Sequence, residues 1–174
     1  MKLLRRVLAI AWNILQCLPP GRLTDPLVVV LRYRRVFGRF PNLNRPSRYS
    51  EKVQRRKLYD RNPLLKMLQD KYLVREYVAG AVGSEYLVPL YQVTQSPEEL
   101  TFDSFPGRFV MKANHGCDWN LFVTDKTAMD PEVMRRTAAG WLSSNFYSKT
   151  REWAYRHIEP RIMVEEFLED DAGF

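Results

Sequence analysis

Three features of the 174-residue sequence predict an α+β fold. Stretches with helical spacing of apolar residues alternate with short β-branched and aromatic stretches, and no repeat or low-complexity tract interrupts them. The chain is 45% hydrophobic and 13% aromatic, which suffices for one good-sized core but hardly for two. We therefore expect an apolar helix over residues 1–22, a basic segment over residues 23–61 and a globular domain over residues 62–174.

The first helix of the globular domain is predicted from its capping residues. Asn62 followed by Pro63 is a good helix start, because asparagine accepts from a free backbone N–H and proline fits the first helical position. The helix is expected to run to about residue 78 and to end near Gly80. Its helical spacing is visible at Leu64, Leu68, Tyr72 and Arg75.

The remaining elements alternate strand and helix. Short apolar runs predict four strands, the last of them near the end of the chain, and proline-led capping sequences predict two helices. The two central strands are separated by a loop short enough for an antiparallel hairpin. The expected strands span residues 87–93, 109–113, 120–124 and 161–167, and the helices begin at residues 96 and 130, the latter running to about residue 146.

Charge is distributed unevenly along the chain. Residues 1–61 contain 15 Lys/Arg and 3 Asp/Glu, a balance of +12, whereas the remaining residues contain 12 and 17, a balance of −5. Such a basic block can be a solvated face, or it can hold nucleic acid, an anionic saccharide or amino-acid substrate, or an anionic lipid surface. No RNA-binding signature with aromatic residues on strands accompanies it, so no specific nucleic acid is expected.

The first eighteen residues combine early basic residues with an apolar run that contains Trp12 and stops at Pro19-Pro20. The run is too short to span a bilayer, which takes about 20 residues, and no cleavage site of small residues follows it. A helix lying in a membrane interface and a helix packing on the domain both remain open. We expect a cytoplasmic protein, with peripheral contact at the inner face of the membrane as the further expectation.

The two cysteines, Cys17 and Cys117, lie far apart in the sequence. They indicate neither a disulfide framework nor a zinc site with paired ligands, and a reducing compartment fits this usage. No metal-binding residues are predicted from the sequence. His115 next to Cys117 resembles a catalytic dyad, but no third member is evident, so the catalytic residues stay unassigned.

Two strands carry the residues that indicate a nucleotide site. The run Phe109-Val110-Met111-Lys112-Ala113-Asn114-His115-Gly116 places a lysine on an apolar strand that ends in a glycine turn, where one cation and several backbone amides can face phosphate oxygens. The later strand ends in Glu165 and Glu166, which must lie on opposite faces. The alternative for Lys112 is a solvent-facing lysine on an edge strand.

These runs, in their order and spacing, resemble the TupA-like ATP-grasp family over residues 24–171. Proteins of that family are associated with surface-polysaccharide and teichuronopeptide biosynthesis and are often labelled glycosyltransferases. Besides residues 109–116, the matching runs are Ser50-Glu51-Lys52-Val53-Gln54, residues 57–63, residues 70–78, Arg151-Glu152-Trp153 with Tyr155, and residues 160–170. The resemblance implies an ATP-grasp-like fold that binds ATP and Mg²⁺.

The resemblance also implies roles for particular residues. Lys112 matches the strand lysine that holds ATP phosphates, and Arg75, with Lys71 one turn before it on the same helix face, matches the second basic position. Asn114 and Gly116 follow Lys112 in the turn that would face the nucleotide. Glu165 and Glu166 match the hinge acids, while the backbone of Phe167 and Leu168 would meet the adenine edge. Arg75 could instead pair with a neighbouring acid.

The parent activity of the resembled fold is ATP-dependent ligation of a carboxylate to an amine through an acyl phosphate. The alternatives are a glycosyltransferase of the same polysaccharide pathway and a non-catalytic accessory at the membrane surface. Two departures stand out: Cys117-Asp118-Trp119-Asn120 replaces a small glycine-rich turn, and the sequence stops soon after the hinge. We expect the Mg²⁺ ligands to lie beyond residue 174, so that this chain binds a nucleotide without turning it over.

Overall fold

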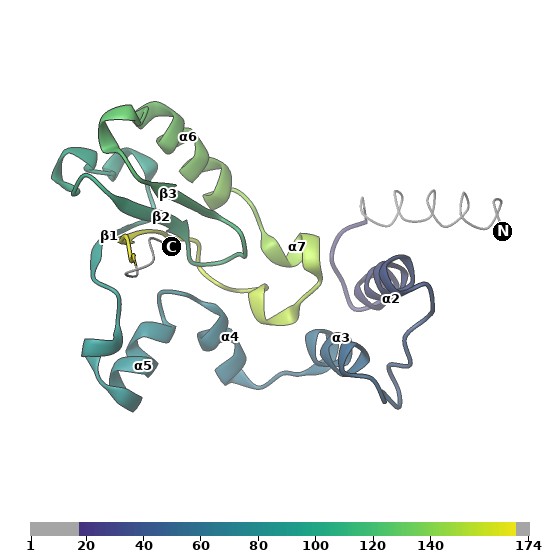
Figure 1. The fold of residues 1–174 in the computed structure, drawn as a ribbon. Coiled ribbons are helices and arrows are strands. Elements are labelled where there is room, and N and C mark those ends of the chain that lie inside the picture. Colours follow the sequence, from purple (N-terminus) through teal and green to yellow (C-terminus); the bar gives the residue numbers. More distant parts are fainter. Residues whose placement is uncertain (1–17, 170–174) are drawn as a thin grey trace. The chain divides into compact units, whose positions relative to one another are not determined.

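The computed structural model describes residues 18–169, and the chain divides into two compact units (Figure 1). The first unit comprises the residues up to Asn62 together with Phe146–Arg156, and the second comprises Pro63–Asn145 together with the residues from His157 onward. The segment Phe146–Arg156 thus packs with the N-terminal unit, although it falls within the predicted 62–174 domain. The predicted helix over residues 1–22 lies largely outside the described residues.

The first unit is helical. It contains α2 (Thr24–Phe37), α3 (Tyr49–Tyr59), α7 (Phe146–Thr150) and the 3₁₀ turn η5 (Trp153–Tyr155). Helix α2 ends at Gly38, whose φ of 72° is the left-handed conformation that glycine adopts without strain. Helix α3 begins where the buried Glu51 carboxylate accepts hydrogen bonds from the backbone N–H groups of Ser47 and Arg48 at 3.1 and 3.2 Å.

The helices at the start of the second unit differ from the prediction. A single helix over residues 62–78 is wrong, because the chain forms α4 (Pro63–Gln69) and α5 (Val74–Val82) with a turn between them. The buried Asp70 carboxylate causes the break: its Oδ1 accepts from the backbone N–H groups of Tyr72 and Leu73 at 2.9 and 3.2 Å. A side chain that caps backbone donors in this way competes with helix continuation.

The sheet of the second unit is antiparallel in every pairing that the structure describes, with the order β1-β4-β2-β3. Its strands are β1 (Leu90–Thr94), β2 (Phe109–Ala113), β3 (Asn120–Val123) and β4 (Ile162–Glu166). The predicted hairpin of β2 and β3 and the last strand are confirmed, whereas the first strand begins three residues later than expected. Short 3₁₀ turns connect the elements, namely η1 (Ser84–Tyr86), η2 (Pro97–Glu99), η3 (Phe102–Ser104) and η4 (Lys126–Ala128).

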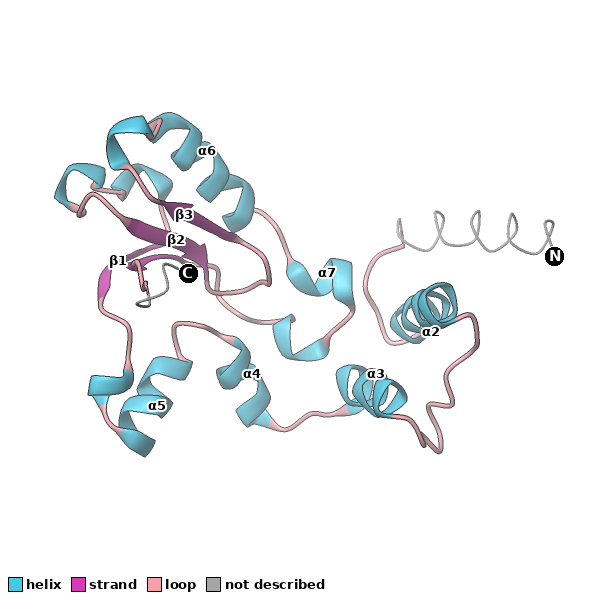
Figure 2. Cartoon of the chain, in the orientation of Figure 1, coloured by secondary structure: helices cyan, strands magenta, loops and turns pink. Residues whose placement is uncertain are grey.

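Helix α6 (Pro131–Leu142) begins as expected at Asp130, whose Oδ1 accepts from the backbone N–H of Glu132 at 2.8 Å. It ends four residues before the predicted end at residue 146, where α7 starts instead (Figure 2). Helices α4 and α5 lie on the side of the sheet opposite α6 (Figure 1). Helices and sheet together confirm the α+β fold class.

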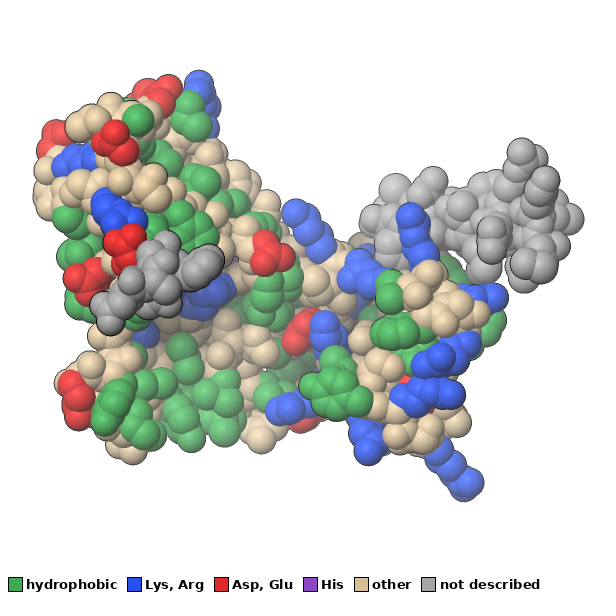
Figure 3. Space-filling view, in the orientation of Figure 1, with side chains coloured by type: hydrophobic (Ala, Val, Ile, Leu, Met, Phe, Trp, Pro, Cys, Tyr) green, Lys and Arg blue, Asp and Glu red, His purple; other side chains and the backbone are tan. Residues whose placement is uncertain are grey.

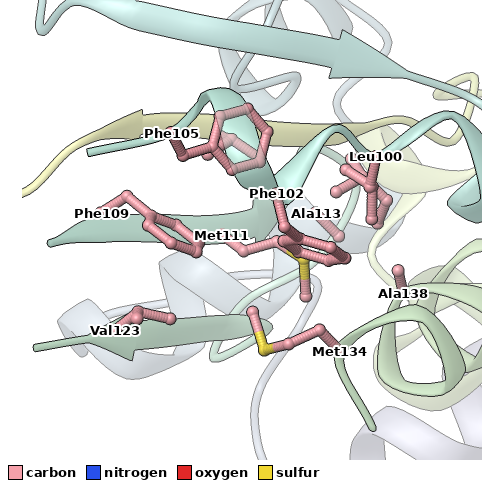
Figure 4. Close-up of a cluster of buried hydrophobic side chains, with 11 residues drawn as sticks. Leu100, Phe102, Phe105, Phe109, Met111, Ala113, Val123, Met134 and Ala138 are labelled. Atoms are coloured by element: carbon pink, nitrogen blue, oxygen red, sulfur yellow. The ribbon is translucent and has the colours of Figure 1, made fainter. Parts of the chain in front are cut away.

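The core of the second unit lies between α6 and one face of the sheet. Alternate residues of β2 and β4 point into it, as the two-residue period of a strand requires. Phe102 and Phe105, from η3 and the residue after it, close the cluster with rings 6.0 Å apart (Figure 4). Its members include Leu100, Phe109, Met111, Ala113, Val123, Met134, Ala138, Ile162 and Val164.

No helix among the described residues is both long and apolar enough to cross a membrane.

Candidate nucleotide site

Lys112 lies on an interior strand, on the sheet face opposite the α6 core. Strand β2 runs between β4 and β3, so the alternative of an edge-strand lysine is wrong. Lys112 is paired with Met163 across the sheet, and Glu165 is the next residue of β4 on the same face. The Lys112 ammonium donates to Glu165 Oε1, forming an ion pair whose side chains are 23% and 9% exposed.

Glu165 and Glu166 project to opposite faces, as the sequence pattern requires. Glu165 shares the face of Lys112 and is buried, whereas Glu166 shares the face of its partner Phe109 and is half-buried. The backbone N–H of Glu166 donates to the carbonyl of Pro89 at 2.9 Å. Of the two acids, only Glu165 is therefore placed next to the strand lysine.

A second ammonium meets the same end of β2. Lys71 Nζ donates to the carbonyl of Ala113 at 3.3 Å and to the carbonyl of Gly116. Burial lowers the pKa of Lys71, and the nearby positive charge of Lys112 acts in the same direction, while Cys117 and Asp118 oppose it.

Lys71 does not share a helix face with Arg75, contrary to the sequence prediction. Lys71 lies in the turn that Asp70 creates, whereas Arg75 lies in α5. Arg75 Nη2 donates to the carbonyl of Val88 at 2.7 Å, and this hydrogen bond joins α5 to the segment that precedes β1. The alternative for Arg75 was an ion pair with a neighbouring acid, whereas this hydrogen bond is made to a backbone carbonyl.

Asn114 is the buried junction of this region. Its amide Nδ2 donates to Asp70 Oδ1 and to the carbonyl of Glu159, both at 2.9 Å, and its Oδ1 accepts from the backbone N–H of Arg161 at 2.7 Å. His115 Nδ1 lies 3.0 Å from the same Oδ1. Both amide hydrogens and a lone pair of the amide oxygen are thus used, so the Asn114 side chain positions the loops around the site.

Gly116 is explained by internal packing. A Cβ at this position would lie 2.4 Å from the ring of Trp119, closer than a real Cβ contact. The Trp119 ring in turn stands edge-on to His115, with ring centroids 5.0 Å apart. The glycine therefore lets the tryptophan close the turn, while its carbonyl accepts from Lys71.

The segment after β4 leads away from the sheet at Phe167 and Leu168. The Phe167 ring is 6.2 Å from that of Phe122, and the Arg108 guanidinium carbon lies 4.3 Å from the Phe167 centroid. The Leu168 side chain is 61% exposed. The segment expected to meet the adenine thus begins beside an aromatic pair on the face that also carries Lys112, since Phe122 is paired with Val110.

The lysine side chains near the end of β2 suit the phosphates of a nucleotide by their charge. Strand β2 carries the Lys112 ammonium, and Lys71 contacts the backbone carbonyl at the end of the same strand; positive charges of this kind match a polyphosphate. Residues 18–169 contain no group of three or more His, Cys, Asp or Glu side chains that could hold a metal ion.

Sequence reasoning missed Asp70 and the structural role of His115. His115 is buried, and its Nε2 donates to the carbonyl of Trp141 at 3.0 Å. Burial lowers the pKa of His115, and the Trp141 carbonyl opposes this effect. The signal for Asp70 was present as an acid in a predicted helix interior, where aspartate is unfavourable.

The sheet, its flanking helices and the lysine-bearing interior strand define an ATP-grasp-like protein, and comparison with known families gives the same result. The model of the TupA-like ATP-grasp family matches residues 51–173. This match covers well over half of the chain, which therefore belongs to the TupA-like ATP-grasp family. ATP-grasp proteins generally bind ATP and Mg²⁺. No curated protein and no solved structure matches the chain.

Proposed function

We propose that the second unit binds ATP, with the phosphates at Lys112 and Lys71 and the adenine edge at the backbone of Phe167 and Leu168. The observation that carries this proposal is the interior-strand Lys112, which shares a sheet face and one strand end with the Lys71 ammonium. A charge-assisted contact from such a group contributes about 1.5–3 kcal/mol. Glu165 holds Lys112 in place until phosphate oxygens compete for it.

The proposed reaction is ATP-dependent ligation of a carboxylate to an amine, in the biosynthesis of a bacterial cell-surface polysaccharide. Bound ATP would supply the phosphoryl group that activates the carboxylate. The chain's own residues would bind and orient the phosphates, and the buried Asp70–Asn114 contact would keep the Lys71 turn next to β2. Family membership supports the reaction class, and the geometry around Lys112 supports the phosphate contact.

Two variants of the ion pair test the phosphate contact. Both Lys112→Met and Glu165→Gln break the pair, but only Lys112→Met removes the ammonium. ATP affinity measured by isothermal titration calorimetry should fall tenfold or more in Lys112→Met, since about 1.4 kcal/mol is a factor of ten. It should be retained in Glu165→Gln. Equal losses in both variants, or unchanged affinity in Lys112→Met, would contradict the assignment.

A second experiment tests the reaction class. Purified protein is incubated with ATP, Mg²⁺ and a panel of uronic acids and amino acids, and phosphate release is followed. Release that depends on a carboxylate substrate supports the ligase. Hydrolysis of a sugar nucleotide would support a glycosyltransferase instead, and absence of both reactions would support an accessory role.

A further inference from the structure

The first unit contains a pocket of about 430 Å³ that the nucleotide site does not use. It is lined by residues of α2, α3, α7 and η5 and of the segments that adjoin them, all within that unit. Its volume lies in the range of small-molecule sites, about 300–1,000 Å³. Arginine and aromatic side chains dominate its wall, among them Arg22, Arg61, Arg156, Tyr59, Tyr147 and Trp153.

The charge of the pocket is positive, although an acid lies in its wall. The Asp25 carboxylate accepts from the buried Arg151 at 3.3 Å, from the backbone N–H of Gly21 at 3.1 Å and from the Tyr147 hydroxyl. Its charge is therefore compensated inside the protein. The three arginines of the wall remain as the charges that a ligand would meet.

The wall is also held in place before any ligand binds. Arg61 Nη2 donates to the carbonyl of Leu58 at 2.6 Å, and its guanidinium lies over the Trp153 ring at 4.7 Å. The Arg156 guanidinium lies 5.5 Å from the Tyr147 centroid. Burial and the Asp25 carboxylate raise the pKa of Tyr147 to about 12, so it keeps its proton and its hydrogen bond at neutral pH. Guanidinium groups fixed in this way lose little freedom on binding.

The backbone of Arg151 is a second sign that the pocket wall is constrained. Arg151 is buried with a φ of 58°, a left-handed conformation that few residues other than glycine adopt, and its Nε has no hydrogen-bond partner among the described residues. Such a conformation persists only where the surroundings hold it. Here its Nη2 donates to the carbonyl of Leu18 at 2.8 Å while Nη1 holds Asp25.

We propose that this pocket binds a small organic anion, namely a sugar ring that carries a carboxylate or a phosphate group. The arginines would bind the oxyanion, whose planar or tetrahedral oxygens match the guanidinium fork. The exposed Tyr59 and the half-buried Trp153 would pack against the sugar ring, since aromatic side chains offer large apolar contact with a polar edge. The ligand is held in the first unit, so its binding does not depend on the proposed nucleotide site.

Titration of the whole chain in the absence of nucleotide tests this proposal. Glucuronate and glucose 6-phosphate are the anionic probes, and glucose is the neutral control. At least one anionic probe should bind with a Kd below about 1 mM, and glucose at least about tenfold more weakly. The anionic probe with the lower Kd shows whether the pocket prefers a carboxylate or a phosphate. Failure of both anions to bind, or equal binding of glucose, would overturn the proposal.

Matched arginine variants locate the binding. Arg22→Gln and Arg61→Gln should each weaken the anion about tenfold. Arg55→Gln, an exposed arginine of α3 outside this pocket, should change it less than about twofold. Arg61→Gln also removes hydrogen bonds to the backbone. If Arg61→Gln misfolds for this reason, the result for Arg22→Gln decides the outcome.

Two results would place the anion elsewhere. An equal loss in Arg55→Gln would mean diffuse attraction to a basic surface. A loss of anion binding in Lys112→Met would mean that the probe occupies the nucleotide site. Unchanged anion binding in that variant would show that the pocket of the first unit binds independently of the proposed ATP site.

Discussion

Asn114 shows how one buried polar side chain can organise the candidate site. It is fully buried and joins Asp70, the carbonyl of Glu159 and the backbone of Arg161 through hydrogen bonds of 2.7–2.9 Å. The backbone carbonyl of Asn114 also accepts from the backbone N–H of Lys71 at 3.2 Å. The turn that carries one proposed phosphate ligand is therefore anchored to the end of the strand that carries the other.

Asn114→Ala should lower the free energy of unfolding by about 3 kcal/mol or more. The substitution leaves several buried polar groups without partners, and each costs about 1–3 kcal/mol. Urea unfolding followed by tryptophan fluorescence measures the loss. Asn120→Ala, a half-buried asparagine on β3, is the control and should cost less than about 1 kcal/mol. Similar losses in both variants would contradict the role of Asn114 as a junction.

His115 should make the fold sensitive to mild acid. Burial holds its pKa below the ordinary 6.5, so between the two values the unfolded chain binds more protons than the folded chain. The free energy of unfolding therefore falls as the pH drops through this window. Unfolding curves at pH 8, 6.5 and 5 should show that fall in the wild type and a shallower one in His115→Gln.

The second histidine provides the control for this measurement. His157 is exposed and is the other histidine of the two in the chain. His157→Gln should keep the wild-type pH dependence. A slope that flattens equally in both variants would show that burial of His115 is not the cause.

At the scale of elements, strands and caps were predictable because their causes are local. The apolar runs of β2, β3 and β4 and the Asp130 cap of α6 depend on neighbouring residues alone. The aspartate in a predicted helix interior was the one local sign of the break between α4 and α5, because the residue that holds Asp70, Asn114, lies 44 residues later. For the same reason, the sequence placed Lys71 and Arg75 on one helix face, and only the turn at Asp70 separates them.

The candidate site shows the same division. Alternation along a strand was enough to put Glu165 and Glu166 on opposite faces, but it could not identify the partner of Glu165. The ion pair with Lys112 depends on the register between β2 and β4, which are 53 residues apart at these positions. The sequence thus predicts which face of a strand a residue occupies, whereas its partner on the neighbouring strand depends on the sheet register.

Two glycines in different elements should respond to alanine in opposite ways. At Gly116, the turn after β2, a Cβ would lie 2.4 Å from the Trp119 ring, and overpacking of this kind costs about 1–3 kcal/mol. At Gly140, inside α6, a Cβ meets nothing within 4 Å, and alanine favours a helix by about 1 kcal/mol. Urea unfolding should show that Gly116→Ala lowers the free energy of unfolding and that Gly140→Ala raises it. A Gly116→Ala variant as stable as the wild type would contradict the packing of Trp119 against Gly116.

At the scale of the whole molecule, positive charge and exposed apolar side chains coincide in the first unit. Lys and Arg side chains cover much of the surface around α2 and α3 (Figure 3). Leu23, Leu27, Val36 and Phe40, in or beside α2, are 82%, 54%, 68% and 59% exposed. Apolar side chains amid basic ones are typical of segments that contact an anionic membrane surface.

We expect the full chain to co-sediment with vesicles that contain anionic lipid. Each Lys or Arg near such a surface contributes about 1 kcal/mol to binding. Because salt screens this attraction and shortens the Debye length, less protein should sediment at roughly 0.5 M NaCl than at roughly 0.05 M. Vesicles of neutral phosphatidylcholine are the control and should retain little protein. Deletion of residues 1–22 removes Lys2, Arg5, Arg6 and Arg22 together with the Trp12-containing run, and should reduce the sedimented fraction several-fold. Equal sedimentation with and without these residues would rule out attachment through the N-terminal segment and leave α2 and α3 as the surface to be tested next.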